Sequence, residues 1–502
     1  MKSQGNPFWG EGEGKDFGKV AIEYAAGEDV ILDAQFVQYE CLVNQAHVVM
    51  LVKQHILHQT IAKKLLTGLS EIKKLDREGK FILKPELEDV HSNVEQYLIR
   101  TLGIRAGGYL RMGIARNDQV YTDTRMFMRE KILSLSHTLL QLLKSLIDEA
   151  EKHTETVMPG YTHLRISQPI TYGHWLTAKA YHFFDDLCGI LTLYDLVNQC
   201  PLGIFEMAGT HLPIDRRLTA KLLGFDGITP NSLYTASQRG EIEAKLIAEF
   251  SFLALHIRRT MNEVILFTTN EFELFTIDNL YTTGGTAQPN LKNPDTLEVV
   301  RANMAKMLPS LIETIMIMDV LSSGYNRDSQ QTKPILFQAI GMMEKTLPIV
   351  TGILSTLTPR KEHMEKIANL NFATAPDVSV QLAVKGRVSF REAYKVVKEL
   401  IKGGYLKTSF SELTPELVFE VSQKVLGKKI RISKESISEV ASARACAFSH
   451  TSEGGSAPRE VKKMIADLAR KIENKEKYIE GKRDMIANGY LLLEKEIKKN
   501  IY

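Results

Sequence analysis

Two long stretches of this sequence, 114–158 and 241–283, contain neither glycine nor proline. The 502 residues include 33 glycines and 16 prolines, so two stretches of this length without either residue predict long helices. Nearer the N-terminus, apolar residues such as Leu42, Val49 and Ile61 recur mostly at helical spacing. Period-two alternation, which is typical of strands, is scarce. The hydrophobic pattern therefore predicts an all-α protein.

The segment 243–267 is apolar around much of its circumference. Its apolar residues are Leu246, Ile247, Phe250, Phe252, Leu253, Leu255, Ile257, Val264, Ile265 and Leu266. A helix with so little polar surface is buried on several sides. A single chain can bury it, but a bundle built from several subunits does so more naturally.

The spacing of the glycines and prolines, which interrupt helices, divides the chain into three predicted parts. Residues 1–113 are expected to form short helices and turns, and residues 114–365 a bundle of long helices in which Pro309 kinks one helix. Residues 366–502 are expected to form shorter helices with a glycine-rich insert, SHTSEGGSAP. We therefore expect an N-terminal helical domain, a central long-helix bundle and a C-terminal helical domain.

Charge and composition restrict the classes of function. The net charge is only +3, which gives no argument for nucleic acid or a membrane as a partner. The lysines of 462–499 alternate with acidic residues, as on a solvated helix face. No run of 18 uncharged apolar residues occurs, so no membrane span is expected.

The cysteines and histidines give no metal prediction. Four isolated cysteines without a CxxC pair fit no zinc template and suit a reducing cytoplasm, and the N-terminus lacks the apolar stretch of a signal peptide. His55 and His58 share a helix face but have no further ligand at a suitable spacing, which favours a surface role. We expect a cytoplasmic protein without metal or cofactor.

Polar loops that are rich in glycine and proline separate the predicted helices, and they contain the candidate site residues. Their candidate residues are Arg116, Asn117, Thr162, His163, Tyr325, Gln330 and Lys333. This mixture suits a substrate with several carboxylates, because arginine grips carboxylates and hydroxyl or amide groups fix the orientation. Each residue also has a structural interpretation: residues 116–119 fit a helix cap, and His163 fits a hydrogen-bonded loop histidine.

The sequences of these loops, and their order along the chain, resemble those of the argininosuccinate lyase family of the fumarase/aspartase superfamily. The resemblance covers nearly the whole chain. It is carried by FWGEG, PELEDVHSNVE, ARNDQVYTD, MPGYTHLRISQPIT, GTHLPIDRRLTAKLLGF, LKNPDTLEVVR, GYNRDSQQTK, VSFREAY and EGGSAP. MPGYTHL and GYNRD, in this order and at this distance, are highly specific.

The resemblance implies a three-domain, all-α homotetramer whose long helices form a shared central bundle with composite active sites. It also implies a carbon–nitrogen lyase of arginine biosynthesis, which eliminates fumarate from argininosuccinate or a related N-succinyl amino acid without a cofactor. Carried over by position, it implies that Arg116 and Asn117 bind the succinyl carboxylates and that His163 belongs to an acid–base network oriented by Glu298. It further implies site positions for Thr162, Asn293, Tyr325, Gln330, Lys333 and Asp89, with Asp89 facing the guanidinium.

One loop departs from the family pattern. The family carries a serine regarded as the base and a lysine that stabilises the anion; the corresponding residues here are Gly285 and Leu291. Thr286 offers a hydroxyl one position later, and Lys292 an ammonium one position later. Three interpretations remain open: Thr286 replaces the base, another base acts on another N-substituted aspartate, or the chain is catalytically impaired. An impaired chain would serve as a ligand-binding or structural subunit, also mixed with an active paralogue.

Overall fold

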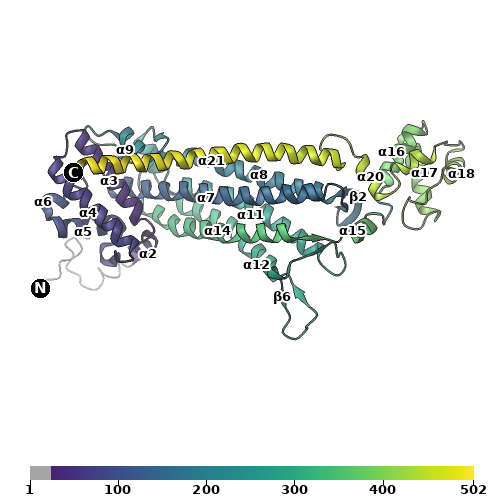
Figure 1. Cartoon of the computed structure of the whole chain (residues 1–502), viewed down its shortest axis with the longest axis horizontal. Helices are drawn as coiled ribbons and strands as arrows, with labels where there is room; N and C mark the ends of the chain where they lie inside the picture. Colours follow the sequence, from purple (N-terminus) through teal and green to yellow (C-terminus); the bar gives the residue numbers. More distant parts are fainter. Residues whose placement is uncertain (1–23, 502) are drawn as a thin grey trace.

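The computed structural model describes residues 24–501, an elongated chain of helices joined by loops and short β-ribbons (Figure 1). The predicted all-α class is confirmed, and the FWGEG motif at 8–12 lies outside the described residues. The central bundle consists of α7 (Arg116–Lys152), α8 (Tyr172–Val197), α11 (Glu241–Phe267) and α14 (Thr332–Thr356). The two predicted long helices are thus present, each inside a stretch without glycine or proline.

The N-terminal part packs against one end of this bundle. It contains α2 (Asp29–Asp33), α3 (Val37–Lys53), α4 (Gln59–Arg77), η1 (Pro85–Leu87), α5 (Val90–Leu102) and α6 (Ile104–Gly107). Helix α3 is almost wholly buried, because it contacts α4, α7 and α21. A short excursion between α8 and α11 adds α9 (Arg216–Leu222), β4 (Gly227–Ile228) and α10 (Ser232–Ser237), with β3 (Gln199–Cys200) pairing with β4.

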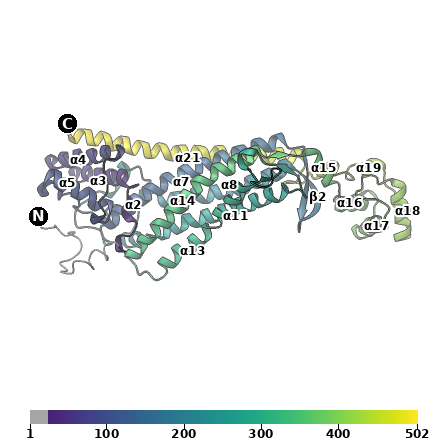
Figure 2. The same cartoon turned by 90° about the horizontal axis from the view of Figure 1, so that it is seen from below.

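The last helix corrects the expectation of shorter helices after residue 366. Helix α21 (Pro458–Ile501) is 44 residues long and runs along the whole bundle (Figures 1 and 2). It buries Ile472, Ile479, Ile486 and Leu493, which recur every seven residues, against the rest of the core. Residues spaced seven apart lie on one side of a helix and form a continuous apolar stripe, so the charged residues of α21 on the other side face solvent.

Beyond the far end of the bundle lies a smaller unit with its own core (Figure 1). Its helices are α15 (Lys361–Ala368), α16 (Ala375–Lys385), α17 (Phe390–Lys402), α18 (Pro415–Leu426), α19 (Lys434–Ser438) and α20 (Ala443–Ser449). Val396, Leu400, Phe410 and Val418 belong to a cluster separate from the main core, which is continuous from the N-terminal helices through the bundle. The three-part domain division stays a prediction.

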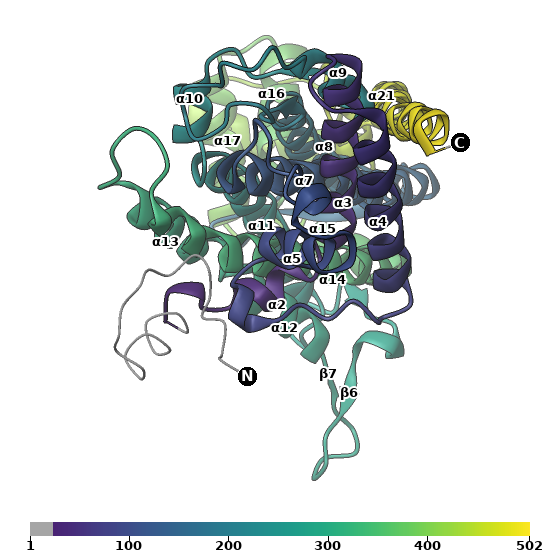
Figure 3. The same cartoon turned by 90° about the vertical axis from the view of Figure 1, so that its left-hand side faces the viewer.

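The remaining short elements carry the loops of interest. β1 (Val157–Thr162) pairs antiparallel with β2 (Arg165–Thr171), and β6 (Thr283–Gly284) pairs with β7 (Lys292–Asn293) in an arm that extends away from the bundle (Figure 3). The others are β5 (Phe275–Thr276) paired with β8 (Thr358–Pro359), η2 (Asn279–Tyr281), α12 (Asp295–Met304), α13 (Met307–Met318) and η3 (Arg327–Gln331). Pro309 lies in the first turn of α13, directly after the interruption at residues 305–306 that separates α12 from α13.

One flank of the bundle is apolar and exposed. On α11, Phe252 is 62% exposed and Leu255 44% exposed; α13 exposes Leu308, Ile312, Ile315 and Met316. Such a contiguous apolar surface is typical of a protein–protein contact. Within residues 24–501, no helix combines the length and hydropathy needed to cross a membrane, and the four cysteines are free thiols.

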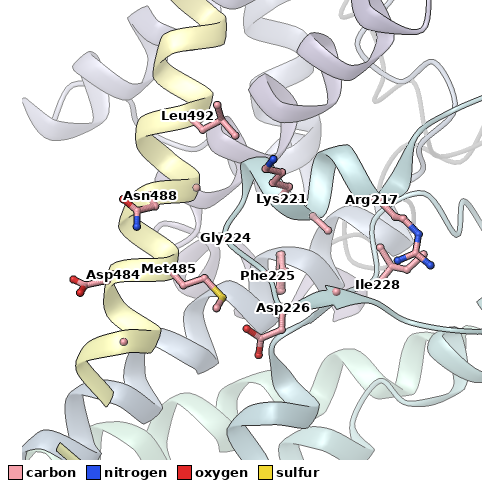
Figure 4. Close-up of a pocket in the computed structure, with 14 residues that line it drawn as sticks. Arg217, Lys221, Gly224, Phe225, Asp226, Ile228, Asp484, Met485, Asn488 and Leu492 are labelled. Atoms are coloured by element: carbon pink, nitrogen blue, oxygen red, sulfur yellow. The ribbon is translucent and has the colours of Figure 1, made fainter. Parts of the chain in front are cut away.

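Helix α21 and the segment after α9 approach each other backbone to backbone. A Cβ on Gly489 would lie 2.5 Å from the amide nitrogen of Gly224, and a Cβ on Gly224 would lie 2.7 Å from the Cα of Ile486. Gly224 and Gly489 both line a cleft of ≈ 650 Å³ that adjoins this contact (Figure 4). Because backbone atoms are in the way, a side chain at residue 489 forces the two segments apart.

Replacing Gly489 by alanine is therefore expected to destabilise the fold by about 1–3 kcal/mol, as overpacking does. Gly481→Ala is the matched control on the same helix, since nothing lies within 4 Å of its Cβ position. There the better helix propensity of alanine should raise stability by up to about 1 kcal/mol. Urea unfolding followed by circular dichroism measures both, and equal midpoints for the two variants would contradict the close approach.

Candidate active site

A polar cavity of ≈ 120 Å³ lies where the N-terminal helices meet the bundle. Its lining includes six of the predicted site residues: Asp89, Arg116, Asn117, Tyr325, Gln330 and Lys333. Arg116 and Asn117 begin α7, Lys333 begins α14, and Asp89 caps α5. The larger cleft beside α21 lacks these converging polar groups. The smaller cavity is therefore the candidate site.

Helix capping explains why the polar loop at residues 115–119 presents its side chains in this way. Asp118 is buried and accepts hydrogen bonds from the backbone amides of Ala115, Gly203 and Phe205, at 2.9, 2.9 and 3.0 Å. These hydrogen bonds satisfy a backbone amide at the start of α7 and link the loop at residues 203–205 to that helix. Arg116 and Asn117 reach the cavity instead. The capping interpretation is confirmed for Asp118, and the substrate-binding roles of Arg116 and Asn117 stay predictions.

Lys333 is held between two carboxylates on the floor of the cavity. Its Nζ lies 2.8 Å from Oδ1 of Asp29 and 2.7 Å from Oδ1 of Asp33, and the lysine is only 5% exposed. Burial alone would lower the pKa of Lys333, but Asp33 and Asp29 outweigh it and raise that pKa. Burial raises the pKa of Asp29, against the opposing charge of Lys333.

The guanidinium of Arg116 pairs with two neighbouring acids. Its Nη1 lies 3.0 Å from Oε2 of Glu88 and 2.9 Å from Oδ2 of Asp89. Burial opposes ionisation of Asp89, but the charges of His91 and Arg116 lower its pKa overall. Asn117 donates a hydrogen bond to Glu206. The cavity therefore contains both a pair of acids that holds a guanidinium and cations suited to carboxylates.

His163 and Thr162 lie at the opposite end of the molecule. They form the exposed tip of the β1–β2 hairpin, where His163 and Leu164 both have positive φ, +53° and +55°. Helix α7 separates this hairpin from Arg116, and its 37 residues span about 55 Å at 1.5 Å per residue. One chain therefore does not bring His163 to the cavity (Figure 1).

The third group of predicted residues lies on the β6–β7 arm and on α12. Thr286 is exposed at the tip of the arm, Asn293 pairs with Thr283, and Glu298 is exposed on α12. Within the described part of the chain, no hydrogen bond or ion pair joins Glu298 to His163. Lys292 donates to Oδ1 of Asn279 at 2.9 Å. The roles of Thr286, Asn293, Glu298, Thr162 and His163 stay predictions.

Several lining residues were missed by the sequence analysis. Asp29 and Asp33 are four residues apart on α2, a spacing that could have indicated a paired set of carboxylates on one helix face. Beneath the cavity, Nδ1 of His91 lies 2.9 Å from Oε2 of Glu40. Burial opposes protonation of His91, but the charges of Glu40 and Asp89 raise its pKa. These groups give the cavity a strongly ionic floor.

The comparisons with known proteins assign this helical bundle, with an ionic cavity at one end and a histidine hairpin at the other, to the lyases of the fumarase/aspartase type. The sequence model of the Lyase family matches residues 27–308. The argininosuccinate lyase of Methanocaldococcus jannaschii is 33% identical over 90% of this chain and 92% of its own; that of Bacillus cytotoxicus is 36% identical over 78% and 86%. The chain belongs to the argininosuccinate lyase family of carbon–nitrogen lyases.

Solved structures agree with this assignment. An EDDS lyase variant with bound fumarate has a TM-score of 0.81 and 25% identity, covering 96% of this chain and 95% of that one. A class II fumarase from Schistosoma mansoni has a TM-score of 0.69 and 12% identity, covering 86% and 95%, and shows the shared fold. The relatives are enzymes, so a non-catalytic role is not favoured over the lyase assignment.

Replacing Lys333 by methionine should cost about 3–5 kcal/mol of stability at pH 7, because the buried Asp33 and the half-buried Asp29 lose their cation. The pKa of Asp29, already raised, should rise further, so the folded variant takes up protons at a higher pH than the unfolded chain. The deficit should therefore shrink as pH falls from 7 to 5.

The matched control is Lys131→Met, which removes an exposed ion pair with Glu344. It should cost less than about 1 kcal/mol, with little dependence on pH. Urea unfolding of the natural protein and both variants at the two pH values measures the differences. A deficit for Lys333→Met that grows toward pH 5 would exclude this charge arrangement.

Proposed function

We propose that this protein catalyses β-elimination of fumarate from argininosuccinate or a closely related N-substituted aspartate. The observation that carries the proposal is the cavity in which Arg116, Asn117, Tyr325, Gln330 and Lys333 converge. A scaffold without a ligand has no physical need for so many polar groups on one cavity. The pairing of Arg116 with Glu88 and Asp89 further indicates where a substrate guanidinium can bind.

The reaction defines the roles that the residues have to fill. A base removes a proton from the carbon beside a carboxylate, the carbon–nitrogen bond breaks, and its electron pair leaves with the nitrogen, which is then protonated. The intermediate carries extra negative charge, so nearby cations stabilise it. Arg116 and Lys333 supply this charge, and His163, oriented by Glu298, takes part in proton transfer. With argininosuccinate the amine product is arginine.

The site is completed by other subunits of a homotetramer. About 55 Å of helix separates Arg116 from His163 within one chain. The exposed apolar surface of α11 and α13, including Phe252 and Ile312, gives the contact that a shared bundle needs. Burying this surface between chains places the hairpin of one subunit beside the cavity of another. An active paralogue could enter the same assembly through this surface.

The β6–β7 arm sets the expected rate. A general base contributes about 10²–10⁴ and one preorganised anion-stabilising group about 10²–10³, so lacking both costs on the order of 10⁴–10⁷. Gly285 and Leu291 occupy the family's two positions, and Lys292 is engaged by Asn279. Thr286, exposed on an arm with two glycines, is the residue available to act as base.

The cysteines and the proposed reaction indicate the cellular compartment and the kind of substrate. The free cysteines suit the cytoplasm, and the substrate is a small N-succinyl compound. Neither a cofactor nor a nucleic acid enters the proposed reaction. An enzyme of this kind would work in arginine biosynthesis.

Fumarate release from argininosuccinate, followed by ultraviolet absorbance, tests the proposal. The natural protein should release fumarate slowly, and the double variant Gly285→Ser/Leu291→Lys should be faster by at least about 10², the contribution of one such group. Thr286→Ala should abolish the remaining activity of the natural protein.

The matched control, Asn290→Ser/Leu280→Lys, adds the same two side chains at other positions of the arm and leaves both of its glycines in place. Asn290 is exposed, and Leu280 is 80% exposed, so this variant should keep the natural rate. Absence of fumarate from both the natural protein and the Gly285/Leu291 double variant would overturn the proposed substrate.

A further inference from the structure

A second cluster of reactive side chains lies at the far end of the bundle, in the unit formed by α16 and α20. Oδ1 of Asp377, Sγ of Cys446 and Nε2 of His450 all lie within 4.8 Å of one another. Cys446 and His450 are four residues apart at the end of α20, so both face Asp377 in the first turn of α16. None of the three belongs to the candidate active site.

The hydrogen bonds of His450 decide which of its nitrogens carries a proton. Oγ of Ser456 lies 3.0 Å from the carbonyl oxygen of Ala447 and 3.1 Å from Nδ1 of His450. A carbonyl only accepts, so both contacts are satisfied when the serine donates to Ala447 and accepts from Nδ1–H. The neutral imidazole then presents a lone pair at Nε2.

That lone pair faces a carboxylate. Nε2 of His450 lies 3.0 Å from Oδ1 of Asp377 and 3.7 Å from Sγ of Cys446. Two acceptors at 3.0 Å repel each other unless a positive charge lies between them, either a proton on the imidazole or a metal ion. The thiol of Cys446 also hydrogen-bonds to Asp377, so three donor groups surround one small space, and a sulfur donor beside an imidazole and a carboxylate favours a metal ion there.

The two distances from Nε2 of His450 are close to those of tetrahedral coordination. With zinc bonds of about 2.3 Å to sulfur and about 2.0–2.1 Å to nitrogen or oxygen, ligand atoms lie about 3.5 Å apart for sulfur and nitrogen and about 3.3 Å apart for nitrogen and oxygen. The observed 3.7 and 3.0 Å lie close to these values. Cysteine, histidine and carboxylate together form a zinc-type donor set.

Outer contacts hold the ligands in place. Nε2 of Gln168 donates to the other oxygen of Asp377 at 3.1 Å, and Ser456 fixes the tautomer of His450. Such contacts are typical of metal-binding carboxylates and histidines. The side chains of His450 and Asp377 are 19% and 17% exposed, which leaves a route for an ion, whereas Cys446 is fully buried and therefore unsuited to act as a nucleophile.

We propose that Asp377, Cys446 and His450 bind one divalent transition-metal ion of the zinc type, with water in the fourth position. Binding displaces the thiol proton of Cys446 to solvent, and the thiolate, imidazole and carboxylate share the ion. The ion joins α16 to α20 and, through Gln168, to β2, whose hairpin carries Thr162 and His163. It therefore fixes the position of that hairpin without touching the substrate.

Cobalt(II) titration of the purified full-length protein, first treated with a chelator, tests this site. A thiolate-to-cobalt charge-transfer band should grow and saturate at one equivalent per chain, and zinc should displace it. Cys446→Ser should abolish the band. The control Cys188→Ser, which removes a half-buried thiol on α8, should leave it unchanged. Circular dichroism checks that each variant is folded.

Asp377→Asn and His450→Asn should each weaken cobalt binding by at least about tenfold, the range found when a supporting or ligating group is lost. Zinc should also raise the thermal midpoint of the natural protein but not that of Cys446→Ser. Absence of a charge-transfer band in the natural protein overturns the proposal, and this result does not depend on any variant folding. An equal band in Cys446→Ser would also overturn it.

Discussion

The length of α7 is the constraint on which the rest of this structure depends. The helix starts at the cavity with Arg116 and ends just before the hairpin that carries His163, so a rigid spacer of about 55 Å separates the two. No rearrangement of loops in one chain spans that distance. The exposed apolar residues of α11 and α13 give the physical means to solve the problem, because they favour association of several bundles side by side.

The cavity of the candidate site contains both cationic and anionic side chains. Lys333 lies between Asp29 and Asp33, and Arg116 lies between Glu88 and Asp89, so each of these two cations is paired with protein acids. Buried charges are tolerated in this way only when they are paired. A substrate that carries both carboxylates and a guanidinium can exchange partners with these pairs while keeping the total charge balanced.

Much of this architecture could be predicted from the sequence, for identifiable reasons. The stretch 114–158 predicted α7 because it lacks glycine and proline. A helix of that length also implies that Arg116 lies far from His163. Helix α21 was underestimated because charged residues and the glycines at 481 and 489 conceal a stripe of one buried residue in seven. The grouping of Asp377 with Cys446 and His450 could not be predicted, since the ligands are 73 residues apart and fit no short spacing motif.

The most direct measurement of the composite site is complementation between two inactive variants, Arg116→Ala and His163→Asn, made in the background that releases fumarate fastest. Each variant alone has one half of every site damaged. After the two are dissociated, mixed and reassembled, a fraction of the sites combines an intact Arg116 from one chain with an intact His163 from another. The account predicts that fumarate release returns in the mixture. Mixed assemblies that form but remain inactive would contradict it.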